Sequence, residues 1–241
     1  MKTEFSENLK QAYCVREDAA KGLWANMNEQ VGIVSISAEC ADSSVRKFEN
    51  IDDLLSFENP RNRRIIALEL KARDEDWGKV VTIDFGHHFD KTIHIRIDGD
   101  DTFVNEFRTK TFDIISGTRP WYSALHKVNF AELLSAGVTL FVLIIMAMAA
   151  YKYLGQDTPL PTEVKVAFRS IIFFGAIFIA VLVLGHLLNT IRDRFFPYSE
   201  FLIGQGKERH EHLARVQWVV GIGLLVSLSA GALLLPIGAS G

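Results

Sequence analysis

Three long uncharged runs constrain most strongly what this chain can fold into. No Asp, Glu, Lys or Arg occurs in residues 133–151, 170–191 or 216–241. An α-helix rises about 1.5 Å per residue, so about 20 apolar residues cross the hydrocarbon core of a membrane. Buried helices of a soluble core are the alternative, but such helices usually carry a polar face, and these runs do not. The sequence therefore predicts three membrane-spanning helices, over about 130–151, 168–190 and 216–237.

Positively charged residues near the ends of these runs indicate the orientation, because Lys and Arg are enriched in cytoplasmic segments. The segment before the first run and the second connector carry Arg119, Lys127, Arg192, Arg194, Lys207, Arg209 and Arg215, whereas the first connector carries Lys152, Lys165 and Arg169. We therefore expect a cytoplasmic N-terminus and a C-terminus outside. The first residues lack the apolar core of a signal peptide. Cys14 and Cys40 are then expected to be free thiols in a reducing compartment.

Residues 1–127 have the mixed pattern of a folded α+β domain, and residues 128–241 form the predicted transmembrane region. Strands are expected where β-branched residues alternate, over 31–38, 45–48, 64–71, 79–85 and 92–97. Helices are expected over 6–30, after the capping residue Asn50, and from the capping residue Asp101 to about Ser116. Together these elements predict an antiparallel sheet with helices on one side.

Two basic segments are candidate ligand sites. "ENPRNRRI" groups Arg61, Arg63 and Arg64 before a strand, and arginine clusters bind phosphate well. They also commonly solvate a turn.

The second basic segment lies in the stretch "FPYSEFLIGQGKERHE", where Lys207 and Arg209 follow a glycine turn and begin a helix. Exposed backbone N–H groups there can hold a phosphate or a lipid headgroup. A simple surface connector between two membrane helices needs the same residues, and it is the preferred interpretation. The apolar residues before the turn are expected to lie along the inner membrane surface; these are Phe195, Phe196, Tyr198, Phe201, Leu202 and Ile203. His210 and His212 are expected on an exposed helix, where they add little to a ligand site.

Polar residues of all three predicted spans fall at one depth. Gln217 opens the third span, and the others are Glu132, Ser135 and Thr139 on the first and His186 and Asn189 on the second. Intramembrane polar residues commonly face a bundle interior or a water-filled path, so the five on the first two spans are candidate pore or gate residues. Ordinary hydrogen bonding between helices near the headgroups is the favoured alternative.

The third predicted span carries Gly223, Ser227 and Gly231 at four-residue spacing. Small residues at this spacing line one helical face and let another helix approach closely. The partner helix can belong to the same chain or to a second copy, and the pattern alone does not choose between them.

The soluble half shows no clear catalytic constellation. His87, His88 and His94 lie with Asp84 and Asp90 around one predicted hairpin, which fits a metal cluster or, more simply, an exposed sheet face. No phosphate-binding glycine loop, nucleophile elbow or zinc-spaced Cys/His set occurs in the sequence. We therefore predict a protein that is not an enzyme and has neither a metal nor a cofactor.

Three stretches, "FENIDDLLSFENPRNRRI", "ISGTRPWYS" and "FPYSEFLIGQGKERHEHLARVQW", resemble a group of small bacterial inner-membrane proteins. These proteins combine a cytoplasmic α+β domain with C-terminal transmembrane helices. Some of them look like membrane effectors of anti-phage defence, including the Hailong type. In that type an oligonucleotide made by a partner nucleotidyltransferase controls a channel.

The resemblance implies a homo-oligomeric, multi-pass inner-membrane channel gated through its cytoplasmic domain by a nucleotide or oligonucleotide. The alternative is a non-conducting scaffold that anchors a cytosolic protein partner in the lipid bilayer. The resemblance supplies no functional residues for either interpretation.

Overall fold

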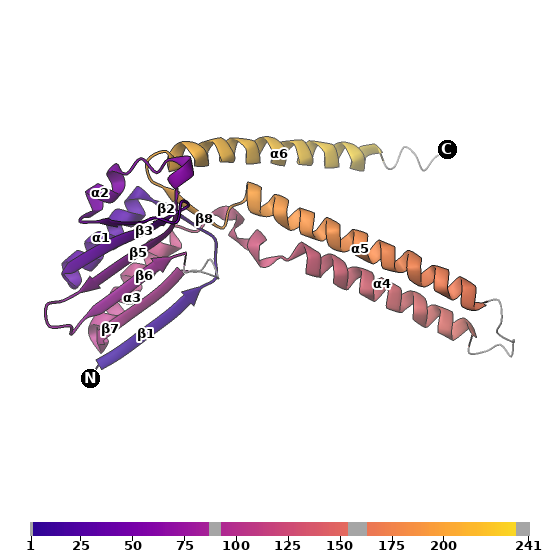
Figure 1. Ribbon diagram of the computed structural model, residues 1–241, viewed down its shortest axis with the longest axis horizontal. Coiled ribbons are helices and arrows are strands. Elements are labelled where there is room, and N and C mark those ends of the chain that lie inside the picture. The colour runs from indigo at the N-terminus through magenta and orange to yellow at the C-terminus, as the bar shows by residue number, and fades with distance from the viewer. Residues whose placement is uncertain (1, 87–92, 154–162, 235–241) are drawn as a thin grey trace. The chain divides into compact units, whose positions relative to one another are not determined.

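The computed structural model describes residues 2–86, 93–153 and 163–234. Within these ranges it describes the backbone alone for 146–153, 163–174, 224–225, 228 and 230–234. A six-stranded antiparallel sheet forms the soluble domain, in the order β1-β7-β6-β5-β3-β4 (Figure 1). The strands are β1 (Lys2–Leu9), β3 (Ile33–Cys40), β4 (Val45–Phe48), β5 (Ile65–Arg73), β6 (Val80–Phe85) and β7 (Ile93–Asp100). This arrangement confirms the predicted α+β domain.

Helices α1 (Glu17–Gln30) and α3 (Asp101–Ser116) supply the apolar cover of the sheet. In β7, Ile93, Ile95 and Ile97 are fully buried, while the side chains between them lie on the other face. That other face is polar and carries ion pairs, such as Arg96 with Glu4 and Asp98. The period-two alternation read from the sequence therefore separates the core face from the solvent face.

Both predicted helix caps exist, one of them displaced by a residue. The Asn50 side chain accepts a hydrogen bond from the Asp53 N–H at the start of α2 (Ile51–Ser56). At the start of α3 the cap is Asp100, whose side chain accepts from the Phe103 N–H, instead of Asp101. In each case the side-chain oxygen, an amide oxygen in Asn50 and a carboxylate oxygen in Asp100, accepts from a backbone N–H in the first turn that has no partner within the helix.

The predicted helix over residues 6–30 is wrong in its first half. The chain forms β1, then β2 (Tyr13–Arg16), and only then α1. β1 pairs along its whole length with β7, from Lys2↔Asp100 to Leu9↔Ile93. Those ladder hydrogen bonds come from residues about ninety positions away, so the local pattern could not show them. Helix α1 continues through Gly22, which faces Ile114 of α3.

A small second sheet joins distant parts of the chain. β2 pairs in parallel with β8 (Ser199–Leu202), from Tyr13↔Ser199 to Arg16↔Leu202. Phe201, Leu202 and Ile203 are buried, and the Tyr13 ring packs against those of Phe85 and Phe201. Burying each such side chain contributes about 2 kcal/mol. The expectation that this stretch lies along a membrane surface is therefore wrong for 201–203, which complete the core of the soluble domain.

The turn after β8 is held in place by Asn59. This fully buried residue has a positive φ of 49°, and its side chain accepts from the Ile65 N–H and donates to the Phe201 and Ile203 carbonyls. Gly204 comes so close to this segment that a Cβ there would lie 2.5 Å from the Glu58 carbonyl oxygen, and a Cβ at Gly206 would lie 3.0 Å from the Asn59 amide nitrogen. We refer to Asn59 and its three hydrogen bonds as the Asn59 clasp.

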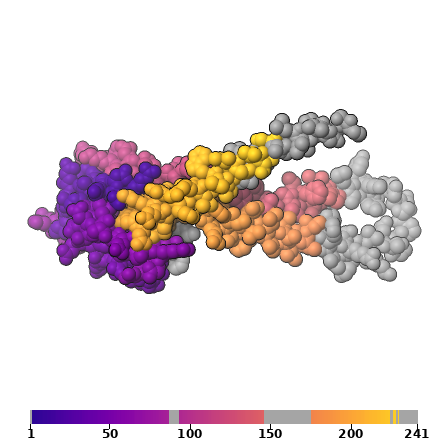
Figure 2. Space-filling view, turned by 90° about the horizontal axis from the view of Figure 1, so that it is seen from above, coloured from indigo at the N-terminus to yellow at the C-terminus, as the bar shows by residue number. Residues whose placement is uncertain are grey.

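Helix α6 (Gly206–Leu234) begins directly at this turn and is uninterrupted. The Lys207 ammonium pairs with Glu17 at 2.9 Å, and the Arg209 guanidinium donates to the Asn59 carbonyl at 2.7 Å. Figure 2 shows the first turns of α6 against the surface formed by the N-terminal residues. The charged half of α6 is thus part of the soluble domain, and it begins the helix that the sequence predicts at Lys207.

Helices α4 (Phe130–Tyr153) and α5 (Glu163–Phe195) pack side by side as a hairpin. Gly185 is their tightest contact, because a Cβ placed there would lie 2.5 Å from the Ala131 Cα. The Asn189 side chain caps α4 by accepting from the Phe130 N–H and donating to Asn129. His126 and Asp193 lie 3.8 Å apart near the same end.

The chain separates into two compact units, which differ from the division expected at residue 127. One unit comprises Met1–Ser123 with Pro197–Gly241, and the other comprises Ala124–Phe196. The segment after the second apolar run therefore belongs with the soluble domain. This follows from the β2–β8 pairing and the Asn59 clasp, neither of which has a local sequence signal.

The described residues contain one helical segment, Gly175–Phe195, that is long and apolar enough to cross a membrane. Two consecutive helices, Trp121–Lys127 and Phe130–Ile145, meet at a bend of 47° and would form a second such segment if they are counted as one span. Of the three predicted spans, the second (168–190) is therefore supported, and the first (130–151) is supported as well if the bent pair counts as one span. The third predicted span, 216–237, runs past the last described residue of α6.

Candidate functional site at the junction of β2, β8 and α6

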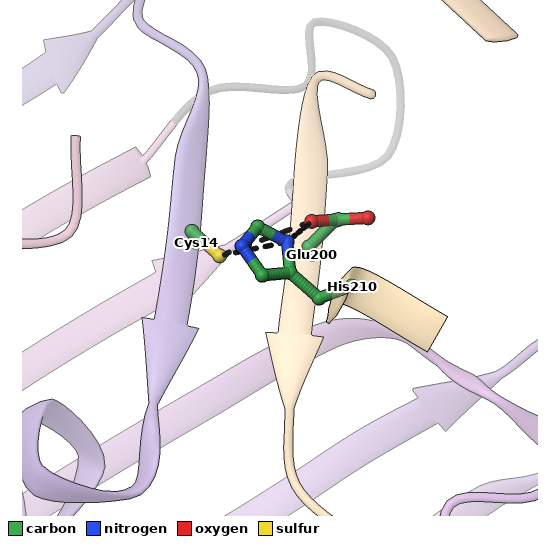
Figure 3. A group of neighbouring side chains, drawn as sticks. All are labelled: Cys14, Glu200 and His210. Carbon is green, nitrogen blue, oxygen red and sulfur yellow. Dashed lines mark hydrogen bonds and ion pairs between the residues drawn. The ribbon is translucent and has the colours of Figure 1, made fainter. Parts of the chain in front are cut away.

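Three side chains of different chemistry converge where β2, β8 and α6 meet (Figure 3). Cys14 comes from β2, Glu200 from β8 and His210 from the second turn of α6. The His210 Nδ1 lies 2.5 Å from the Glu200 Oε2, and the Cys14 Sγ lies 3.9 Å from that oxygen and 4.0 Å from the His210 nitrogen. We call these residues the Cys14–Glu200–His210 cluster.

The secondary structure explains why these side chains meet. β2 and β8 run in parallel, and Cys14 and Glu200 are direct partners in the register. Direct partners in a two-stranded pair point to the same face, so the thiol and the carboxylate lie side by side. The glycine turn at 204–206 then reverses the chain, which brings the second turn of α6 back over that face.

The environment changes the acid–base properties of the cluster. Burial, and then the negative charge of Glu200, raise the pKa of the Cys14 thiol to about 12. The hydrogen bond to Glu200 raises the pKa of His210 above its usual value, although partial burial opposes this. Arg16 acts in the opposite direction and lowers the pKa of both residues. At neutral pH the thiol is therefore protonated.

A cavity of about 180 Å³ adjoins the cluster. Cys14 and His210 lie in its wall, and the remaining wall consists of Arg16, Gly117, Thr118, Arg119, Pro120, Trp121, Tyr122, Ala214, Gln217 and Trp218. Residues 117–122 follow α3 directly, and the Cys14 N–H donates to the Thr118 carbonyl at 2.8 Å. The cavity thus connects the cluster with the end of α3.

The geometry does not fit a Cys–His–acid catalytic triad. In a triad the nucleophile bonds one imidazole nitrogen and the carboxylate bonds the other. Here the thiol and the carboxylate both approach Nδ1 of His210. A thiol with a pKa of about 12 is also a poor nucleophile at neutral pH. The three groups offer one sulfur, one nitrogen and one oxygen atom, all within 4.8 Å of one another.

The structure brings together some of the predicted ligand-binding residues. Arg61 and Arg63 form the short 3₁₀ helix η1 (Arg61–Arg63), and both side chains are exposed, as is Arg64. Desolvation, together with the positive charges of Arg64 and Arg61, lowers the pKa of Arg209, whereas Glu200 opposes this. Arg209 therefore shares its surroundings with Arg61 and Arg64, but Lys207 pairs with Glu17.

The predicted histidine site cannot be assembled from the described residues. His87, His88 and Asp90 lie outside them. His94 and Asp84 are direct partners of β7 and β6, and the His94 Nδ1 lies 2.8 Å from the Asn8 Oδ1.

The predicted pore or gate residues are occupied mainly with local hydrogen bonds. Ser135 and Thr139 donate to the Glu132 and Ser135 carbonyls of their own helix. Glu132 accepts from Asn129 at 2.7 Å, and Asn189 caps α4. His186 is exposed on α5. The Asn189 contacts join two helices and fit the structural alternative, whereas those of Ser135, Thr139 and Glu132 are local. A pore role stays a prediction.

The small-residue face of α6 is open at the position where its surroundings are described. A Cβ at Gly223 would meet no described atom within 4 Å, and the exposed Ser227 hydroxyl donates to the Gly223 carbonyl. The surroundings of Gly231 lie outside the described residues. The close helix contact that the structure does show is at Gly185, which the sequence pattern did not single out.

Sequence reasoning missed the Cys14–Glu200–His210 cluster. Cys14 and Glu200 are 186 positions apart, and His210 was expected on an exposed helix. The stretch "YSEFLI" offered no usable signal, because Ser199 and Glu200 precede three consecutive apolar residues and the period-two alternation of a half-buried strand is missing.

Searches against family models, curated proteins and solved structures found no match to this chain.

Proposed function

We propose that the chain is a homo-oligomeric effector of a bacterial inner membrane, in which an anionic nucleotide or oligonucleotide bound to the sheet domain opens an ion pathway. The observation that carries this proposal is the continuity of α6. One helix begins inside the soluble domain at Gly206 and continues into the uncharged run that starts at Val216. A shift of the helix base therefore reaches the apolar segment without an intervening loop.

The basic residues around the helix base are the proposed ligand site. Arg209 already donates to the Asn59 carbonyl, and the nearby Arg61 and Arg64 raise the local positive charge. A phosphate group placed among them would relieve their mutual repulsion and form charge-assisted hydrogen bonds. Such a ligand gates the protein only if it binds the open and closed arrangements of α6 with different affinities.

The test is conduction by the full-length protein in liposomes, measured with a voltage-sensitive dye. ATP and short RNA oligonucleotides serve as probes of the ligand class. We expect ion flux on addition of a probe, and a reduction of at least tenfold in the double variant Arg61→Gln/Arg64→Gln. Lys47→Gln, an exposed charge removed from β4, is the matched control and should conduct as the wild type. Protein that never conducts with any probe would contradict the proposal.

Gly223→Leu tests the assembly part of the proposal in the same assay. If the open small-residue face joins subunits, the Leu side chain should abolish both the oligomer in detergent and the ion flux. Retention of the oligomer with full flux would remove this face from the proposed interface.

The second candidate is a non-conducting scaffold that holds a cytosolic partner at the membrane. One observation favours it: the edge strand β4 of the sheet leaves the apolar side chain of Val45 64% exposed. An edge strand offers unpaired backbone groups to a partner strand. A stable complex recovered from cells, together with an intact membrane potential, would favour this function over the channel.

A further inference from the structure

We infer that Cys14, Glu200 and His210 form a binding site for one zinc ion or a similar divalent transition metal. Thiolate, imidazole and carboxylate are the three side-chain types that bind zinc in proteins. They come here from three separate elements, and all their ligand atoms lie within 4.8 Å of one another. This inference concerns the soluble domain alone, so it stands or falls independently of ion conduction.

The distances are close to those of a zinc site. Metal–ligand bonds of about 2.0–2.3 Å in a tetrahedron place neighbouring ligand atoms about 3.3–3.6 Å apart. The Cys14 Sγ lies 3.9 Å from the Glu200 oxygen and 4.0 Å from the His210 nitrogen, so each has to move inward by a few tenths of an ångström. The His210 and Glu200 atoms, now 2.5 Å apart through a hydrogen bond, have to separate. Small side-chain rotations are sufficient for both changes.

The charges in the cluster suit a divalent cation. A metal ion displaces the thiol proton, after which Cys14 and Glu200 each carry one negative charge and His210 is neutral. The ion with its three ligands then has no net charge, which suits a half-buried site.

The position predicts what the metal does for the fold. It would link β2, β8 and the second turn of α6, which the chain otherwise joins through the β2–β8 pairing and the Asn59 clasp. The adjoining cavity leaves the fourth coordination position to water or to a small ligand. Binding to the folded state alone also stabilises that state.

The test is titration of the chelator-treated, tag-free full-length protein in detergent with Co²⁺, followed by competition with Zn²⁺. We expect one equivalent of Co²⁺ with the thiolate-to-cobalt charge-transfer absorption, loss of this absorption on adding Zn²⁺, and a higher midpoint of thermal unfolding with Zn²⁺. Cys14→Ser should remove the charge-transfer absorption, whereas Cys40→Ser, which removes the other buried thiol, should retain it.

One further pair of variants and one single variant keep the test decisive if Cys14→Ser fails to fold. His210→Gln should weaken Zn²⁺ binding at least tenfold, while His212→Gln on the exposed side of the same helix should not change it. Glu200→Gln keeps the thiol and the size of the side chain, and it should also weaken binding at least tenfold. Absence of the charge-transfer absorption in the wild type, its persistence in folded Cys14→Ser, or equal Zn²⁺ affinity in His210→Gln and His212→Gln would overturn the inference.

Discussion

At the scale of single residues, Asn59 shows how one side chain connects two distant segments. It adopts a left-handed backbone conformation, which Asn tolerates better than most residues. Its amide oxygen and both amide hydrogens are used, because it accepts from Ile65 and donates to Phe201 and Ile203. The sequence predicted basic ligand-binding residues in "ENPRNRRI" but did not indicate that Asn59, the first asparagine of this stretch, is buried.

Asn59→Ala should destabilise the soluble domain by about 3 kcal/mol, because three buried hydrogen bonds are lost and the Ile65 N–H loses the side-chain acceptor that it has in the structure. The measurement is the midpoint of unfolding of the full-length protein, followed by far-ultraviolet circular dichroism. Asn62→Ala, three residues along the same segment and exposed, is the control and should change stability by no more than about 0.5 kcal/mol. Equal effects of the two substitutions would show that the Asn59 clasp does not hold the β8 turn.

At the scale of elements, the two apolar helices of the hairpin are joined by close packing at one end. Gly185 lets α5 approach Ala131 of α4, and Asn189 completes the hydrogen bonding at the start of α4. In lipid the hydrophobic effect does not hold helices together, so for helices that span a membrane such small-residue contacts and interhelical hydrogen bonds dominate association. Asn189, one of the predicted gate residues, therefore has a structural role as the cap of α4.

Gly185→Leu should separate α4 from α5, because the added side chain occupies the position of the Ala131 backbone. We expect faster hydrogen–deuterium exchange across 130–145 and 175–195 in the full-length protein. Gly137→Leu is the matched control, since a Cβ there meets no described atom within 4 Å. Unchanged exchange in Gly185→Leu would contradict the close packing of the hairpin.

At the scale of the whole molecule, the proposed signal passes through a single helix. The clusters around Cys14 and Arg209 both lie on the first turns of α6, so a ligand at either one acts on the base of the same rigid element. A helix transmits a displacement only while its backbone hydrogen bonds are continuous. The channel proposal therefore depends on the integrity of the boundary between Arg215 and Val216.

Insertion of Gly-Ser-Gly-Gly between Arg215 and Val216 should abolish ligand-dependent ion flux and leave metal binding at Cys14 unchanged. The same insertion between Asp42 and Ser43, in the exposed turn between β3 and β4, should leave both properties unchanged. Liposome flux and cobalt absorption provide the two readouts. Undiminished flux with the interrupted helix would exclude α6 as the route of gating.

The sequence by itself determined those features that depend on neighbours along the chain. Alternating apolar residues gave β3 to β7, Asn50 gave a helix cap, and the absence of charge marked the apolar helices. Each of these signals is local, because side-chain period and backbone capping involve residues only a few positions apart.

Only the tertiary structure decided how the two ends of the chain combine. The pairing of β2 with β8, the edge position of β1 and the meeting of Cys14, Glu200 and His210 join residues about ninety to two hundred positions apart. A parallel strand pair has no turn sequence of its own, and a ligand cluster spread over three elements has no spacing motif. The stretch "FPYSEFLIGQGKERHE" therefore reads locally as a connector, yet it contributes a core strand and one wall of the candidate site.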